Sequence, residues 1–527
     1  MLALRRTSLR PATVALALWA SAAHGQLIDR TLAPNAAHEG IAKTLAQEIG
    51  AGRGNATTPG SSLFIIRRDP FRAIRRGRQL FQRKFTHAQG QGPRAHDGVG
   101  DVGTDLAIGA GLSDSCAGCH GRPRGAAGFG GDVATRPDSR DAPHLFGLGL
   151  KEMLADEITR HLRAIRSRAI AQASLGNDAV TLPLASKGID YGTLTARPDG
   201  SVDTSRVQGV DADLRVRPFF AHGGTVSIRE FVVGALHNEM GLDAVDPDTV
   251  AASGGGRVTT PAGMVLDGRI DHLEAAPTAD PNADPDGDGV RNEVPTSLVD
   301  FLEFYLLNYF AAGTGEQTEG IAQGRTLFGR IGCASCHVQN LVVNRDRRVA
   351  SVETAFDPTH GILNRLFATA TPLHDTRDDG KGFPALHPPR GAPFVVRNIF
   401  TDLKRHDVGA AFHERDYDGS VRTQFLTTPL WGVGSTAPYG HDGRSINLTE
   451  VILRHGGEAQ AARDAFERLE AEDRLLLLDF LGSLILFPPD DTASNLDPGN
   501  PATSGFPQFG HGSIRLGVLF NDPTDPE

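Results

Sequence analysis

One five-residue pattern occurs twice in this sequence, and its duplication constrains the fold more than any other feature. SCAGCH spans 115–120 and GCASCH spans 332–337, so two CxxCH motifs contain all four cysteines of the 527 residues. Each cysteine pair has its own adjacent histidine, and no thiol is left over for a disulfide or for nucleophilic catalysis. Whatever the chain builds around this motif, it builds twice.

Zinc, redox and haem chemistry all use paired cysteines. A zinc site usually needs two pairs close in sequence, and a redox dithiol of the thioredoxin type needs a βαβ context that neither motif has. In CxxCH, by contrast, two thiols can add to the vinyl groups of one haem while the histidine reaches its iron. We therefore predict two covalently bound c-type haems, held by Cys116, Cys119 and His120 and by Cys333, Cys336 and His337.

The first 25 residues have a basic start, an apolar centre and a small-residue exit, which is the pattern of a secretory signal peptide. No later segment reaches the roughly 20 apolar residues of a spanning helix. We expect an exported, periplasmic protein without a membrane span, in agreement with haem attachment after export. The net charge of −10 disfavours nucleic acid and is compatible with a small basic redox protein as electron donor.

The duplication extends beyond the cysteines. GRQLF (77–81) recurs as GRTLF (324–328), LFGLG (145–149) recurs as LWGVG (430–434), and FFAHGGTVSIREFVV (219–233) resembles PYGHDGRSINLTEVIL (438–453). Blocks in the same order indicate two copies of one unit. The expected division is a signal peptide at 1–25, an N-terminal extension at 26–68, haem domains at 69–310 and 314–487, and an irregular tail at 488–527. Insertions are expected near 176–213, 243–295 and 340–420.

Regular patterning along the chain is helical. The segment 297–310 is apolar on most faces, with Ser297 and Asp300 spaced as a capping box, and 151–173 has helical spacing. Few segments resemble strands. We therefore expect a mainly α protein, with two cytochrome c-like haem domains in tandem, long loops and few short strands.

The sixth ligand of each iron separates electron transfer from catalysis. In the second half, Leu448, Val451, Ile452 and His455 share one face of a predicted helix that ends at Gly456. His455 is therefore the candidate sixth ligand of the second haem. The alternative is a histidine that only complements the helix dipole.

The corresponding first-half helix has Ala235 where the repeat places His455. No ligand is offered there, and Glu239 follows one turn later. An open iron with a nearby carboxylate suits peroxide chemistry, because a base must move a proton between the two peroxide oxygens. His237 or Met240 filling the position is the competing interpretation.

These residues resemble the bacterial dihaem cytochrome c peroxidase and MauG superfamily, and most closely its dihaem oxidoreductase branch. The likeness lies in GCASCH, in TPLWGVGSTAPYGHDGR (428–444), in LFGLGLKE (145–152) and in KRHDVG (404–409). The resemblance implies that one haem is peroxidatic and the other relays electrons, with a distal glutamate matching Glu239. Relatives carry Met or Tyr where His455 stands, so this departure implies bis-histidine ligation and a lower potential than a His/Met haem.

Other residues have weaker signals. Trp431, in LWGVG, is either an electron stepping stone at a haem edge or a packing residue. Three histidines stand beside glycine-rich turns, namely His222, His406 and His441. They are candidates to bond haem propionates or the loop backbone, and a structural role is expected for each. Asp284, Asp286 and Asp288 alternate before a glycine, which is compatible with calcium or with a solvated acidic turn.

Three functions are compatible with these features. The first is a dihaem peroxidase-type oxidoreductase, in which the haem on His120 reacts with hydrogen peroxide and the haem on His337 relays electrons. The second is a pure electron-transfer cytochrome with two six-coordinate irons. The third is a dihaem oxygenase acting on an organic substrate with dioxygen.

Overall fold

The computed structural model describes residues 44–93, 111, 113–120, 141–308, 313–359, 365–378, 380, 384–387, 391–416 and 419–486. The expected signal peptide and the C-terminal tail lie outside these residues. Part of the expected N-terminal extension is helical, as α1 (Leu45–Ile49) and α2 (Ser62–Arg68). In the described part of the chain, no helix combines the length and apolar character needed to cross a membrane.

The first half is organised around α3 (Pro70–Gln82), which packs against α9 (Thr296–Leu307) beside α7 (Ile228–Met240). Gly77 permits the close approach, because a Cβ there would lie 2.3 Å from the Phe301 carbonyl oxygen. The expected capping box at Ser297 is wrong. Helix α9 begins one residue earlier, after Pro295, and the carboxylate of Asp300 binds buried partners instead.

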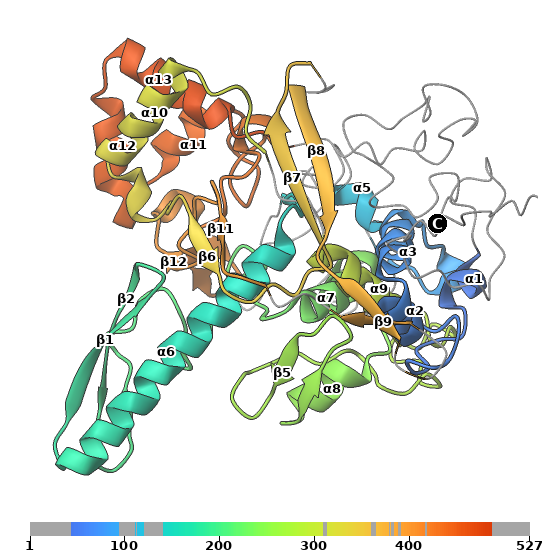
Figure 1. Ribbon diagram of the computed structural model, residues 1–527. Helices are drawn as coiled ribbons and strands as arrows, with labels where there is room; N and C mark the ends of the chain where they lie inside the picture. Colours follow the sequence, from blue (N-terminus) through green and yellow to red (C-terminus); the bar gives the residue numbers. More distant parts are fainter. Residues whose placement is uncertain are drawn as a thin grey trace, which may run out of the picture.

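The second half repeats this helix pair. Helix α10 (Glu319–Arg330) packs against α13 (Ala471–Gly482), with α11 (Leu448–Arg454) and α12 (Gln460–Glu467) beside them (Figure 1). Gly324 has the role of Gly77, since a Cβ there would lie 1.9 Å from the Leu476 carbonyl oxygen. The repeated GRxLF blocks therefore place a glycine at the same kind of helix crossing.

The prediction of a mainly α fold of two cytochrome c-like domains is wrong in its class. The structure is 40% helical and 13% strand. Its described residues form seven small sheets and show no clear cytochrome c domains, so the fold is mixed α and β. The pairs are β4 (Arg257–Thr259) with β5 (Val265–Asp267), β6 (Leu341–Val343) with β11 (Phe394–Val396), β7 (Ala350–Phe356) with β8 (Leu366–Pro372), β9 (Asp375–Asp378) with β10 (Pro384–His387), β12 (Arg405–His406) with β15 (Phe425–Leu426), and β13 (Glu414–Arg415) with β14 (Val421–Arg422).

The largest departure is in the segment 176–213, where an insertion but no sheet was expected. It forms an antiparallel sheet of β1 (Val180–Ser186), β2 (Ile189–Ala196) and β3 (Val202–Asp203). The sheet lies along the 29-residue helix α6 (Leu148–Gly176), and together they project as an arm (Figure 1). Ile189 and Tyr191 of β2 are buried, and after a shift of one residue Leu194 and Ala196 are buried, so each pair has the two-residue spacing of a strand that a search for helical spacing overlooks.

The two halves meet through another repeated block. Gly147 of LFGLG has a φ of +71°, and a Cβ on it would lie 2.2 Å from the ring of Trp431 in LWGVG. Gly432 has a φ of +73°, and a Cβ there would lie 2.4 Å from Leu486, which belongs to the apolar core of the first half. The matching glycines therefore let the two halves pack closely.

The first half contains a buried ionic cluster. Arg229 of α7 binds Asp246 at 2.6 Å, Asp300 at 2.9 Å and Glu303 at 2.9 Å, and these side chains are at most 1% exposed. Asp246 also caps α8 (Pro247–Ser253) by accepting from the Thr249 amide. The cluster thereby joins α7, α8 and α9, because buried charges require ionic or hydrogen-bonded partners.

Candidate functional site

The two CxxCH motifs place their histidines in the same way. His120 ends the short helix α5 (Cys116–His120), and its Nδ1 lies 2.7 Å from the Pro143 carbonyl oxygen. His337 follows the turn η2 (Cys333–Ser335), and its Nδ1 lies 3.1 Å from the Phe400 carbonyl oxygen. A carbonyl accepts from Nδ1–H, so the lone pair is on Nε2, as in histidines that bind metals.

Each histidine has a phenylalanine of the repeated GRxLF block beside it. The ring of Phe81 lies 6.5 Å from His120, and the ring of Phe328 lies 6.0 Å from His337. Cys116 packs against the apolar core of the first half, and Cys333 packs against that of the second. Both motifs thus offer two thiols and one imidazole at an apolar wall, which fits a covalently attached haem.

His455 offers a third imidazole of the same kind. It caps the C-terminus of α11, and its Nδ1 lies 2.6 Å from the Val451 carbonyl oxygen, so Nε2 again has the lone pair. Leu448 and Ile452 of α11 pack with Cys333 against the second apolar core, as the predicted helix face required. The structure therefore brings His455 to the same apolar region as the second CxxCH motif.

Desolvation keeps these imidazoles neutral. It lowers the pKa of His337 to about 4, and it also lowers the pKa of His120 and of His455. A neutral imidazole is the form that binds iron, because protonation removes the lone pair. All three residues are therefore in the protonation state that axial ligands need at neutral pH.

The competing uses of the cysteines fit less well. Burial raises the pKa of the Cys116 thiol to about 12 and that of Cys333 to about 11, whereas reactive redox dithiols have a lowered pKa. All four cysteines are in the described part of the chain, and none forms a disulfide. Within that part, no group of metal-ligand atoms joins the two cysteine pairs, as a four-thiolate zinc site would.

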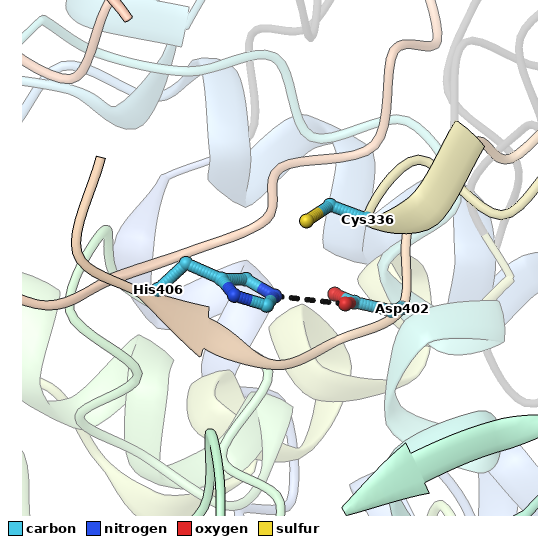
Figure 2. A group of neighbouring side chains, drawn as sticks. All are labelled: Cys336, Asp402 and His406. Atoms are coloured by element: carbon cyan, nitrogen blue, oxygen red, sulfur yellow. Dashed lines mark hydrogen bonds and ion pairs between the residues drawn. The ribbon is translucent and has the colours of Figure 1, made fainter. Parts of the chain in front are cut away.

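One cysteine does lie among other ligand-type groups. Figure 2 shows Cys336, Asp402 and His406 converging, and their ligand atoms lie within 4.8 Å of one another. Both ring nitrogens of His406 are engaged, with Asp402 at 2.8 Å and with Glu458 at 2.8 Å. Desolvation lowers the pKa of His406, but hydrogen bonds to Asp402, Cys336 and Glu458 outweigh it and raise the pKa to about 11, which favours a protonated ring without a lone pair for a metal.

Helices α7 and α11 begin with the same interactions, which fixes the equivalence of their residues. The Ser227 side chain accepts from the Glu230 amide, and the Asn447 side chain accepts from the Glu450 amide. Each glutamate in turn accepts from the amide preceding its cap, at 2.8 Å in both copies. Counting from these caps places Ala235 at the position of His455.

The residues that follow Ala235 occupy the C-terminal turns of α7. Met240 is only 3% exposed in the first apolar core, and Nδ1 of His237 lies 2.9 Å from Asp243. Glu239 is half-buried, and its carbonyl oxygen accepts from the Ser113 amide, three residues before Cys116. The structure therefore brings Glu239 near the first CxxCH motif through the backbone.

Trp431 is 2% exposed at the junction of the halves, and among the described residues its indole nitrogen has no hydrogen-bond partner.

His144, which sequence reasoning missed, links Trp431 to the first motif. His144 hydrogen-bonds the Trp431 backbone, and desolvation together with the charge of Lys151 lowers its pKa to about 4. His144 is one residue beyond the carbonyl that orients His120, but no local pattern identifies it.

The remaining candidates have other partners. The carboxylates of Asp284, Asp286 and Asp288 lie within 4.8 Å of one another, and Asp284 accepts from three loop amides. His441 stacks on Phe425 with ring centroids 4.3 Å apart, and its carbonyl accepts from the Asp141 amide of the first half. His222 stacks on Phe220 with ring centroids 6.0 Å apart.

Comparison with known proteins gives one result for the second half. No curated protein matches the chain at a significant level. Residues 392–484, which contain His406, Trp431 and His455, match the family described as "Di-haem oxidoreductase, putative peroxidase". Over this segment, the resemblance predicted from the motifs is confirmed as a match to the dihaem oxidoreductase branch.

Proposed function

We propose that the chain is an exported dihaem c-type oxidoreductase that reduces hydrogen peroxide at its first haem site. The family match supports two haems and an oxidoreductase of the peroxidase type. The observation that carries the proposal is the asymmetry between equivalent positions, with an imidazole at His455 and a methyl group at Ala235. A site that lacks a sixth protein ligand has room for a small substrate.

The chain's own residues attach and orient each group. Cys116 and Cys119 would form thioethers in the first half, and the Pro143 carbonyl would hold the ring of His120. Cys333 and Cys336 would do the same in the second half, with the Phe400 carbonyl orienting His337. When bound, haem supplies the one-electron redox chemistry that side chains lack.

Glu239 is the proposed proton carrier of the first site. It lies one helical turn beyond Ala235, so both residues share one face of α7. A carboxylate there accepts the proton of hydrogen peroxide and returns it to the departing oxygen, which is general acid–base catalysis. His455, by contrast, closes the second site and leaves it to electron transfer.

Electrons enter from a small redox protein in this proposal. The leader-like residues 1–25 support a periplasmic location, and the net charge of −10 suits a basic donor. Trp431 lies between the halves, in contact with Gly147 and bound to His144, which suits it to an electron step between the sites. Calcium at Asp284, Asp286 and Asp288 stays a prediction.

The first experiment measures haem content, spin state and peroxide reduction on the purified full-length chain. We expect two covalent haems, one low-spin and one high-spin, and turnover of peroxide with a reduced small donor. Two low-spin haems that leave peroxide untouched would instead identify an electron-transfer cytochrome. Dioxygen consumption with an organic substrate, without peroxide turnover, would identify an oxygenase.

The second experiment replaces the proton carrier. Glu239→Gln should lower peroxide turnover by about 10²- to 10⁴-fold while both haems remain attached, because general acid–base catalysis contributes on that scale. Glu472→Gln, on the exposed side of α13, is the control and should retain turnover. Undiminished turnover of the Glu239 variant would exclude this role.

A further inference from the structure

His406 is outside the expected ligand set, yet it joins two segments that flank the second candidate haem site. Its Nε2 lies 2.8 Å from Asp402 Oδ2, and its Nδ1 lies 2.8 Å from Glu458 Oε2. The side chains of His406 and Asp402 are 8% and 2% exposed. Each ring nitrogen faces a carboxylate oxygen, so each carries a proton and both hydrogen bonds are charge-assisted.

The Asp402 end belongs to the loop that orients His337. Asn398, Phe400 and Leu403 have φ values of 54°, 52° and 55°, a left-handed conformation that is unfavourable for residues with bulky side chains. Such a conformation persists only where the surrounding structure holds it in place. Asp402 lies between the two apolar residues, so the bond from His406 helps to hold the carbonyl of Phe400 against His337.

The Glu458 end belongs to the turn directly after His455. Glu458 Oε1 accepts from the Asp407 amide at 3.0 Å, and the Glu458 amide donates to the Asp407 carbonyl at 2.9 Å. The Gly456 amide donates to the Val408 carbonyl at 2.7 Å. The segment that carries His406 is therefore fastened to the residues following the candidate sixth ligand.

A third contact places His406 at the attachment point itself. Figure 2 shows its ring beside Cys336, the thiol next to His337 in the motif. The short strand β12, paired with β15, fixes the backbone of His406. The ring of His406 therefore bonds the loop that contains Phe400 and the turn that follows His455. It also lies beside Cys336.

We infer that His406 is a positioning residue, which as a cation bonded to Asp402 and Glu458 holds His337 and His455 at the distance that keeps both on the second haem. The inference rests on the proposed function, because it needs a haem at this site. Without the His406 ring, the carboxylates of Asp402 and Glu458 lose the donor that they share, and the turn after His455 loses one of its attachments.

The test compares His406→Ala with His413→Ala. His413 is a matched control, because its Nε2 also binds a carboxylate, Asp407, at 2.9 Å in the same segment. Intact mass and haem content come first, followed by carbon monoxide titration of the reduced protein and the midpoint potential of the low-spin haem. In His406→Ala, with two haems attached, carbon monoxide should bind the second haem at least about tenfold more tightly than in the wild type, which corresponds to about 1.4 kcal/mol.

His413→Ala should match the wild type in these measurements. If His406→Ala does not retain haem, Glu458→Gln keeps the Asp402 bond and should show the same change at smaller size. Unchanged carbon monoxide binding and potential in a His406 or Glu458 variant that has both haems would overturn the inference. A wild type without two haems would instead contradict the proposed function, so the two failures are distinguishable.

Discussion

The two halves share the start of one helix but surround it differently. Ser227 and Asn447 cap α7 and α11 in the same way, and both glutamates return to the preceding backbone. Yet α7 is buried and extends to Met240, whereas α11 is half-exposed and ends at Arg454. The capping interactions of the two helices are therefore the same, whereas their lengths and burial differ.

The two helices also differ at two aligned positions. The residue eight positions after the cap is Ala235 in the first half and His455 in the second. The residue two positions after the cap is Arg229 in the first half and Thr449 in the second. Arg229 is fully buried among carboxylates, whereas Thr449 is half-buried. The helix of the first half thus carries a buried ionic cluster and a methyl group at the position where the second half has the imidazole of His455.

The largest expected effect comes from removing the difference in ligands. Ala235→His should lower peroxide turnover about 100-fold if the new imidazole is bound about 99% of the time, because only the remaining fraction is competent. Peroxide kinetics and the optical spectrum measure this.

The reciprocal His455→Ala should turn the low-spin haem high-spin, and an unchanged spectrum would refute His455 as a ligand.

The buried cluster gives the next effect. Arg229→Met should destabilise the protein by about 3–5 kcal/mol, because Asp246, Asp300 and Glu303 lose the buried cation that they share. Of the three, Asp300 keeps a second cation, Arg53, at 3.5 Å. Thr449→Ala is the equivalent change in α11 and should stay within about 0.5 kcal/mol. Thermal unfolding measures both, and equal losses would remove the distinction between the halves.

The same cluster predicts a pH dependence. Burial, opposed by Arg229, raises the pKa of Glu303 from 4.5 to about 7. The folded state therefore holds a proton that the unfolded state has lost between pH 4.5 and 7, so this contribution to stability falls as the pH rises through that range, on the order of 3 kcal/mol in total. Glu303→Gln should remove that slope from the unfolding free energy, and an unaltered slope would refute the assignment.

The smallest effect concerns the junction. Gly147→Ala should cost about 1–3 kcal/mol, because its methyl group would meet the ring of Trp431. Gly432→Ala should cost a similar amount through Leu486, without displacing the indole. Tryptophan fluorescence should therefore change in the first variant alone, and identical emission in both would contradict the described contact.

Sequence alone predicted the features that depend on local pattern. The repetition of the GRxLF blocks, the helical face that ends at His455 and the alignment of Ala235 with His455 follow from spacing and repetition, which the sequence displays directly. The sheet of β1 and β2 was missed because its alternation lies inside an apparent insertion.

The rest of the site depends on contacts between distant segments. The carbonyls of Pro143 and Phe400 reach their histidines over 23 and 63 residues, and His406 reaches Glu458 over 52. Phe400 has a left-handed backbone conformation, which is usually found at glycine, so its residue type does not predict this conformation. Such positions become visible only when the tertiary structure brings them together.

The most direct test of the account is the number of carbon monoxide molecules that the fully reduced wild-type protein binds. If Ala235 leaves the first haem open and His455 closes the second, the protein should bind one carbon monoxide for every two haems. Binding of none would show that another side chain fills the first position, and binding of two would show that His455 does not hold the second. Either result would contradict the division of labour between the halves.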